Sequence, residues 1–288
     1  MGEHYLGIDV GYSNDEATTG LCLITVNGNS LQWRCLKSFK DSKKRSEDLR
    51  WLIPKGARIA GVAIDGPLAP NLELINHYRS AEALLITGEF GKRGKPGQAN
   101  SGNGQQLHYH ATQLANLVVA LHEIQHFSLA SATHPDAIHK FRLVEAFPTG
   151  FLAVLPEHDD CIPYGRHKCD RYWEAPRVLN NLRQLLNFLL PNCRPPGELA
   201  NITDHEHRAA FICALTALCL ERNQYVSVGD AEDGEIILPP IEVWGHNDSG
   251  DRWAELALRE NLPKVRGNRR FPCHKTARVM RNGQRWIG

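Results

Sequence analysis

The chain has 288 residues, of which 42% are hydrophobic and 23% are charged, the balance of an ordinary globular protein. Its formal net charge of +1 excludes a strongly acidic or basic chain, and no apolar run approaches the roughly 20 residues that a membrane helix needs. No secretory signal pattern is present, so we expect a cytoplasmic protein with no membrane partner. The eight cysteines are scattered, which favours reduced thiols over a disulfide framework.

In chain order the sequence predicts three strands, a helix, a fourth strand, two helices, a fifth strand, two more helices and a short last strand. Apolar runs bounded by turn residues give the strands, at residues 4–10, 18–26, 31–39, 58–64, 141–147 and 236–238. Apolar residues at helical spacing give the helices, at residues 43–53, 73–85, 109–127, 174–190 and 204–221. Between them, the segment 88–104 is rich in Gly, Lys and Asn and indicates a mobile loop.

This order of elements predicts an α/β fold built on one mixed sheet. Asn27 and Gly28 form a strong hairpin signal, so we expect the second and third strands to pair antiparallel. The fourth strand is nearly continuously apolar, which suits a strand that is covered on both faces. Antiparallel strands followed by alternating strands and helices predict a mixed sheet with helices on both faces. We expect one domain at residues 1–240 and a C-terminal extension with a basic tail at 241–288.

Asp9 and Asp65 each end an apolar strand-like run. A carboxylate at the open end of a buried strand must pair, take up a proton or hold a cation, because burying its charge alone is expensive. Two such strands in a metal-dependent fold place both acids within one coordination sphere. The alternative is that both acids form turns beside a glycine, which is common turn chemistry.

Asp204 and His207 begin the last long helix and lie one turn apart on the same face. A carboxylate and an imidazole in this arrangement can serve as ligands of Mg²⁺ or Mn²⁺. The sequence also fits a capping box with Thr203 as the N-cap and Glu206 three residues later, which explains both acids of this turn by helix capping alone. Glu145 lies in an apolar strand, where it either faces solvent or is a fourth acid near the same sheet edge.

Four blocks of the sequence and a later stretch resemble a known family, and the four blocks occur in that family's order. They are Gly7-Ile8-Asp9-Val10-Gly11, Ala63-Ile64-Asp65-Gly66-Pro67-Leu68, Val144-Glu145-Ala146-Phe147-Pro148, Asp204-His205-Glu206-His207-Arg208-Ala209-Ala210, and the stretch from Val228-Gly229-Asp230 to Pro239. Over about residues 4–240 the chain therefore resembles the RNase H-like family named domain of unknown function 429. That family is grouped with predicted nucleases, and its wider fold includes the Holliday-junction resolvases.

The resemblance implies a five-stranded RNase H-like mixed sheet and a nuclease that depends on two ions of Mg²⁺ or Mn²⁺. In the wider fold the catalytic acids lie on the first strand, the fourth strand and the last helix, which here are Asp9, Asp65 and Asp204. His207 matches a further ligand one turn along the helix, and Glu145 is added as a catalytic candidate without a firm counterpart. Asp9 would bridge both ions, Asp65 and Asp204 would each bind one, and His207 would be a ligand or a proton acceptor. Resolvase-like relatives often pair, so the expected partners are DNA or RNA and a second copy in a homodimer.

Binding of a phosphate backbone needs Lys and Arg side chains that are free to approach it. The candidates for substrate binding are cations in or near predicted loops and helix starts, namely Lys92, Arg93, Lys95, Arg79, Lys168 and Arg171. The tail at 264–288 adds eight Lys and Arg and contains no Asp or Glu. The alternative is that these charges face water, with Arg79 forming a surface ion pair with Glu82 on one helix face.

Two other functions remain open from the sequence. One is a non-catalytic nucleic-acid-binding or regulatory module, in which the acids are structural and the basic tail binds. The other is an ATP-dependent phosphotransferase of the actin and sugar-kinase type, whose first strand often reads Gly-Ile-Asp-x-Gly followed by Thr or Ser. Here Gly11 is followed by Tyr12 and Ser13, and no second glycine-rich phosphate motif is present.

Overall fold

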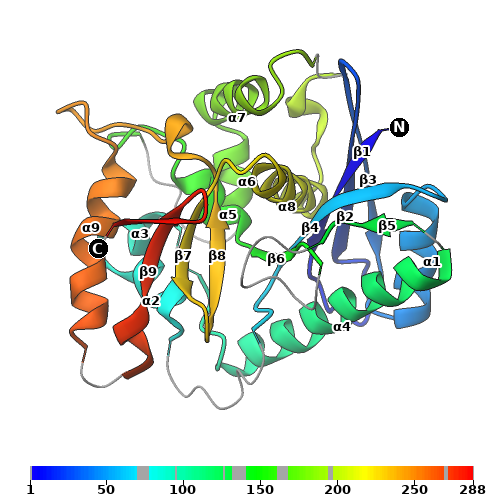
Figure 1. Ribbon diagram of the computed structural model, residues 1–288, viewed down its shortest axis with the longest axis horizontal. Helices are drawn as coiled ribbons and strands as arrows, with labels where there is room; N and C mark the ends of the chain where they lie inside the picture. Colours follow the sequence, from blue (N-terminus) through cyan, green and yellow to red (C-terminus); the bar gives the residue numbers. More distant parts are fainter. Residues whose placement is uncertain are drawn as a thin grey trace.

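The computed structural model describes residues 2–69, 78–94, 96–125, 127–131, 141–160, 168–193, 197–268 and 272–287. Within these ranges the chain forms one mixed sheet of ten strands with helices packed against it (Figure 1). The expected α/β class and mixed sheet are confirmed. The expected number of five strands is wrong.

The N-terminal part of the sheet contains the strands that the sequence predicts. They are β1 (Glu3–Asp9), β2 (Thr19–Asn27), β3 (Ser30–Ser38), β4 (Arg58–Asp65) and β6 (Leu143–Ala146). Strands β1, β2 and β3 pair antiparallel, whereas β4 is parallel to β1 and β6 is parallel to β4. The β2–β3 hairpin turns through two residues, and Gly28 adopts a φ of +56°, as the first central residue of a type II′ turn does.

The other strands lie mostly at the far side of the sheet. They are the two-residue β5 (Ser128–Leu129), which pairs with β4, and β7 (Val226–Asp230), β8 (Gly234–Leu238), β9 (Arg278–Arg281) and β10 (Gln284–Ile287). The sequence analysis missed four of these strands because they have two to five residues, too few for a clear alternation of polar and apolar positions. Since β9 pairs with β7, the end of the basic tail belongs to the same sheet as the N-terminal strands.

Helices cover both faces of the N-terminal strands, as expected (Figure 1). On one face α8 (His205–Glu221) lies across β1, β2 and β4, together with α5 (Pro148–Ala153), α6 (Lys168–Trp173) and α7 (Pro176–Leu189). On the other face lie α1 (Ser42–Leu52) and α4 (Gly102–Gln125). Side chains of β1 alternate between these layers: Tyr5 packs in the α8 core, whereas Leu6 and Ile8 pack against α1 and α4.

A third core surrounds β7 and β8 and contains α2 (Ser80–Ile86), α3 (Gly88–Arg93) and α9 (Trp253–Arg266). The expected mobile loop at 88–104 is wrong, because its first six residues form α3 and its last three begin α4. The reason is Phe90, which is buried and packs its ring against Trp253 at a centroid distance of 5.3 Å. The helix expected at 73–85 falls partly outside the described residues, and the described part is helical from Ser80.

Short 3₁₀ helices complete the described structure, at Leu199–Asn201, Ile241–Val243 and Pro272–Thr276. None of the helices in the described ranges combines the length and the apolar character that crossing a bilayer requires.

Candidate active site

Asp9 and Asp65 lie side by side at the ends of two parallel strands. They are the last residues of β1 and β4 and are direct partners in the register of the two strands. Neighbouring strands are only about 4.8 Å apart, and paired residues point to the same face of the sheet. The two carboxyl groups hydrogen-bond to each other. Because an ionised carboxylate can only accept, one of the two must carry a proton in this contact.

The pKa values of both acids are raised. Burial is the largest cause for each, since it disfavours the charged form. For Asp65 the charge of Glu145 adds to burial and raises the pKa to about 7. For Asp9 the charges of Asp65, Glu206 and Asp170 add to burial, and its pKa lies well above the ordinary value. Negative charge from several elements therefore converges on Asp9.

Helix α8 brings Glu206 next to Asp9 because glycines let the helix approach the sheet closely. Gly20, the partner of Asp9 on β2, has no side chain, and a Cβ there would lie 2.1 Å from the carbonyl oxygen of Glu206 and 3.1 Å from its Cβ. A Cβ on Gly7 would likewise lie 2.0 Å from the carbonyl oxygen of Ala210. The first turn of α8 therefore lies directly over the ends of β1 and β2. This contact explains why the charge of Glu206 acts on Asp9.

Asp204 has other partners. It is the N-cap of α8, and its Oδ1 accepts the backbone N–H groups of Glu206 and His207 at 3.1 and 3.3 Å. Its Oδ2 lies 2.8 Å from Nζ of Lys37 on β3. Burial works to raise the pKa of Asp204, but hydrogen bonds from Lys37, Glu206 and the helix backbone outweigh it and lower this pKa to about 2. The expectation that Thr203 caps the helix is wrong, because Asp204 performs that role.

Two further side chains, Asp170 and His207, lie on helices α6 and α8, which pack against each other. Asp170 on α6 accepts hydrogen bonds from Nδ1 of His205 at 2.9 Å and from Arg208 at 3.1 Å, and its charge raises the pKa of Asp9. His207 follows one residue after Glu206, and its buried Nε2 has no hydrogen-bond partner among the described residues. The sequence analysis did not assign a site role to Glu206 or Asp170. The motif around Asp204 contains Glu206, whereas nothing in the sequence marks Asp170.

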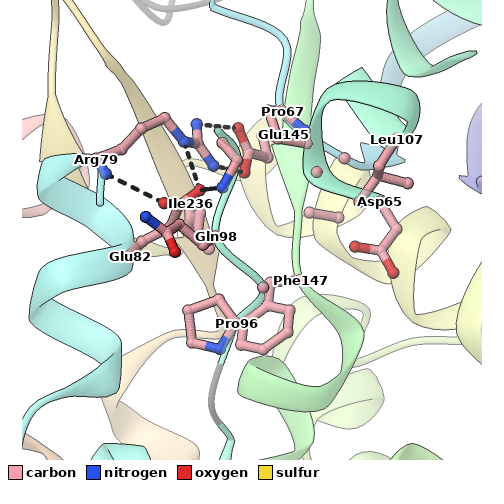
Figure 2. A pocket seen from close by; sticks show the side chains of 15 residues that line it. Asp65, Pro67, Arg79, Glu82, Pro96, Gln98, Leu107, Glu145, Phe147 and Ile236 are labelled. Atoms are coloured by element: carbon pink, nitrogen blue, oxygen red, sulfur yellow. Dashed lines mark hydrogen bonds and ion pairs between the residues drawn. The ribbon is translucent and has the colours of Figure 1, made fainter. Parts of the chain in front are cut away.

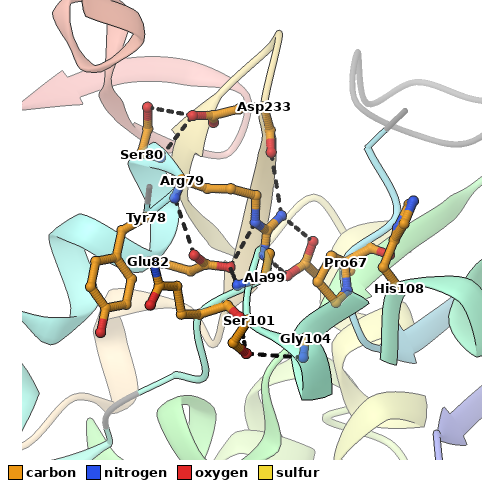
Figure 3. Close-up of polar contacts among 12 residues, drawn as sticks. Pro67, Tyr78, Arg79, Ser80, Glu82, Ala99, Ser101, Gly104, His108 and Asp233 are labelled. Atoms are coloured by element: carbon orange, nitrogen blue, oxygen red, sulfur yellow. Dashed lines mark hydrogen bonds and ion pairs between the residues drawn. The ribbon is translucent and has the colours of Figure 1, made fainter. Parts of the chain in front are cut away.

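Glu145 takes part in a buried ion-pair network centred on Arg79, whose other partners Glu82 and Asp233 are labelled in Figure 3. The two carboxylate oxygens of Glu145 accept hydrogen bonds from both Nη atoms of Arg79, at 2.6 and 2.8 Å. Nε of Arg79 lies 2.9 Å from Glu82, and its Nη1 also reaches the carbonyl oxygen of Asp233 at 3.3 Å. Arg79 is only 1% exposed, so its expected surface ion pair is in fact buried. The network joins α2, β6 and the β7–β8 turn.

An open pocket of about 580 Å³ lies between Asp65 and this network. Figure 2 shows the Asp65 carboxyl group on one side of the pocket and the paired Arg79, Glu82 and Glu145 on the other. The charge of Arg79 is matched by two carboxylates, so the network leaves no free cation facing the pocket. Glu145 still influences the site, because its charge contributes to the raised pKa of Asp65.

The other basic candidates lie in varied surroundings. Arg93 is buried, with its guanidinium 4.4 Å from the ring centroid of Trp253 and bonded to the carbonyl oxygen of His158. Lys92 pairs with Glu89 at 2.9 Å, and Nζ of Lys168 donates to the carbonyl oxygen of Lys92 at 2.6 Å. Arg171 lies on α6 and is exposed. Lys95 lies outside the described residues.

Three cations of the basic tail pair with acids that lie outside it. Arg278 lies 2.6 Å from Glu235 on β8, and Arg281 pairs with Glu242. Lys264 lies 3.7 Å from Glu260. These pairs were invisible in the tail sequence, because every carboxylate comes from outside it.

Comparisons with protein-family models, with curated proteins and with solved structures find no match for the chain. Among the described residues, no three His, Cys, Asp or Glu side chains are already arranged as a metal-binding group. The geometry thus defines a pair of partly buried, hydrogen-bonded carboxyl groups, and the charges of further acids on α8 and α6 act on Asp9.

Proposed function

We propose that the chain is a divalent-metal-dependent nuclease that hydrolyses phosphodiester bonds at the rim formed by β1, β4 and α8. The observation that carries the proposal is the adjacent pair Asp9 and Asp65, whose pKa values are raised by burial and by the charges of neighbouring acids. Buried groups with strongly perturbed pKa values cluster at functional sites. The strand order β3-β2-β1-β4-β6 supports the RNase H-like assignment. It places the first and fourth strands, which carry the catalytic acids in that fold, next to each other.

The donor set fits a hard cation. Asp9, Asp65 and Glu206 offer carboxylate oxygens, which Mg²⁺ and Mn²⁺ prefer over nitrogen or sulfur. Two adjacent carboxylates need positive charge between them, which the shared proton provides in the metal-free chain. A divalent ion would bring two positive charges to the same place. In this proposal Glu206 takes the α8 position that sequence analysis gave to Asp204, because both Asp204 oxygens already have partners.

A bound divalent ion would lower the pKa of an attacking water and stabilise the leaving oxygen. The chain's own residues would do the rest. Asp9 and Asp65 would release their shared proton on binding the cation, so the affinity for the cation would increase as the pH rises. His207, with its free Nε2, is placed to accept a proton beside Glu206. Lys37 holds Asp204 and thereby ties the first turn of α8 to β3.

The test is cleavage of plasmid DNA and of a structured RNA by the purified full chain with Mn²⁺ or Mg²⁺. We expect Asp9→Asn to abolish cleavage while the variant keeps its fold by circular dichroism. Asp15→Asn is the matched control, since Asp15 is an exposed acid of the loop that follows β1. Full activity in Asp9→Asn, or its loss in Asp15→Asn, would contradict the proposal. A third variant, Glu206→Gln, tests whether this acid contributes, and we expect a large loss of rate.

A further inference from the structure

A groove lies on the α1 and α4 side of the sheet, a short distance along the chain from Asp9. It has a volume of about 1030 Å³ and is lined by Asn14, the β3–α1 connection from Phe39 to Ser42, Lys44 and the α4 segment that contains Tyr109. Helices α1 and α4 lie side by side here (Figure 1). Asn14 follows Asp9 by five residues, so the chain between them spans at most about 18 Å.

Two exposed aromatic rings line this groove. Phe39 is 44% exposed and Tyr109 is 59% exposed, and they are among the few large apolar side chains of the described residues that are open to solvent. The Tyr109 ring is held in place rather than free. Its hydroxyl accepts a hydrogen bond from Gln113 at 2.8 Å, and the edge of His110 meets it at a centroid distance of 5.1 Å. The groove therefore presents two exposed aromatic rings, and these contacts hold the Tyr109 ring.

The layer behind these rings is also fixed. His110 stacks on Tyr12 with ring centroids 5.6 Å apart and planes 8° apart. Nη1 of Arg45 lies 3.5 Å from Nδ1 of His110, and its Nη2 donates to the carbonyl oxygen of Gly11 at 2.6 Å. Because a guanidinium can only donate, Nδ1 of His110 accepts and the ring is neutral. Burial and the charge of Arg45 lower the pKa of His110, in agreement with this assignment.

Positive charge accompanies the rings. Lys40 lines the groove and forms no ion pair with any described residue, and its charge reaches His110. Lys44 also lines the groove, although it pairs with Asp48 at 2.7 Å, and Asp41 is occupied as the N-cap of α1. Exposed aromatic rings beside a cation that has no ion pair are a combination that binds single-stranded nucleic acid, because bases stack on the rings and phosphates meet the cation.

We propose that this groove binds the single-stranded part of a nucleic-acid substrate, with bases stacked on Phe39 and Tyr109 and a phosphate at Lys40. The inference rests on the proposed function, since it makes the groove an extension of the site at Asp9. The loop that leaves β1 links the two, because Arg45 holds that loop at Gly11. A substrate with a single-stranded arm beside the scissile bond is thus favoured over a uniform duplex.

The test is binding without cleavage. A fluorescein-labelled single strand of about 12 nucleotides is titrated with the full chain in EDTA, and fluorescence anisotropy gives the affinity. We expect Phe39→Ala and Tyr109→Ala each to weaken binding roughly 5- to 150-fold, as loss of a stacked base does. Tyr109→Phe keeps the ring and should bind nearly as wild type. Lys40→Ala should weaken binding and reduce its dependence on salt.

Phe188→Ala is the matched control. Phe188 is 42% exposed, close to Phe39, but lies on α7, which packs with α8 on the opposite face of the sheet. Equal affinity of wild type, Phe39→Ala and Tyr109→Ala would overturn the inference, as would an equal loss in Phe188→Ala. Base stacking would also be refuted if Phe39→Ala and Tyr109→Ala weakened binding of a duplex probe as much as binding of the single strand. Because the assay contains no divalent ion, a wild type that binds through the groove but never cleaves with Mn²⁺ refutes only the nuclease.

Discussion

Replacing Asp65 by asparagine is expected to stabilise the metal-free protein at and above neutral pH. In the folded chain burial, followed by the charge of Glu145, raises the pKa of Asp65 from 3.8 to about 7. The unfolded chain exposes the same carboxyl group to water, where it ionises near its ordinary value. Folding therefore opposes ionisation of Asp65, and asparagine removes that opposition.

The sign and magnitude follow from proton linkage. Below pH 3.8 both states hold the proton, so Asp65 has no effect on stability. Between pH 3.8 and about 7 the unfolded state has lost the proton and the folded state has kept it, so stability falls by about 1.4 kcal/mol per pH unit. Above pH 7 the accumulated penalty is on the order of 4 kcal/mol. Asn retains the contact with Asp9, because its amide can donate to a carboxylate.

The assay is urea unfolding of wild type and Asp65→Asn in EDTA at a series of pH values from 4 to 8.5. We expect the two stabilities to agree near pH 4 and to diverge until the variant is more stable by about 2–4 kcal/mol at pH 8. Mn²⁺ should raise the melting temperature of wild type and leave that of Asp65→Asn unchanged, because only a folded site binds the ion. Asp15→Asn, in an exposed position, should change stability by less than about 0.5 kcal/mol throughout.

Either of two results would refute this reasoning. If Asp65→Asn shows the same pH slope as wild type, the carboxyl pair is not strained in the folded state. A variant that is less stable than wild type at pH 8 would show that Asp65 is a structural acid. In either case the best physical support for a cation site at this rim is lost.

Three further variants test the remaining parts of the description. Asp204→Asn should destabilise the protein by about 1–2 kcal/mol at pH 7. The stabilisation by Asp204 is present above pH 3.8 and is lost as the pH falls toward 2, the lowered pKa of this acid, so the pH profile of urea unfolding measures it. Glu145→Gln should cost about 3–5 kcal/mol of stability because it leaves the buried Arg79 without one of its two carboxylate partners. Glu260→Gln, in an exposed ion pair, should cost less than about 1 kcal/mol. Equal losses of stability in thermal unfolding would contradict the buried network. Gly20→Ala should cost about 1–3 kcal/mol of stability and reduce any metal-dependent activity, since its Cβ would meet a carbonyl oxygen of α8 at 2.1 Å. Gly197→Ala is the control: its Cβ would meet nothing within 4 Å, so stability and activity should not change.

Sequence reasoning predicted the central strands and the two strand-end acids well. Strands β1 and β4 are buried on both faces, so their residues form apolar runs that end visibly at Asp9 and Asp65. A parallel pairing then brings strand ends to one edge of the sheet, which makes the proximity of the two acids a consequence of topology. This part of the site depends on local pattern and simple pairing rules, both of which the sequence displays.

The sequence could not distinguish between the acids of α8. Asp204 and Glu206 lie in the same turn, and their roles depend on Lys37, which lies on β3, and on the bare backbone at Gly20. Both partners are far away in sequence. The same limit applies to Arg79, whose partners other than Glu82 lie on β6 and at the β7–β8 turn. Partners that are distant in the sequence determine which charged groups are paired, and the local sequence pattern does not indicate them.

Asp204 on one side and the pair Asp9 and Asp65 on the other have opposite pKa shifts and opposite effects on stability. Asp204 has a lowered pKa because a lysine and a helix N-terminus hold its charge, so it stabilises the fold when ionised. Asp9 and Asp65 have raised pKa values because their burial is matched by no cation among the described residues, so their charge destabilises the fold. A protein tolerates such a cost where function requires it. The unpaired acids, rather than the larger number of paired ones, are therefore where a divalent cation has the most to contribute.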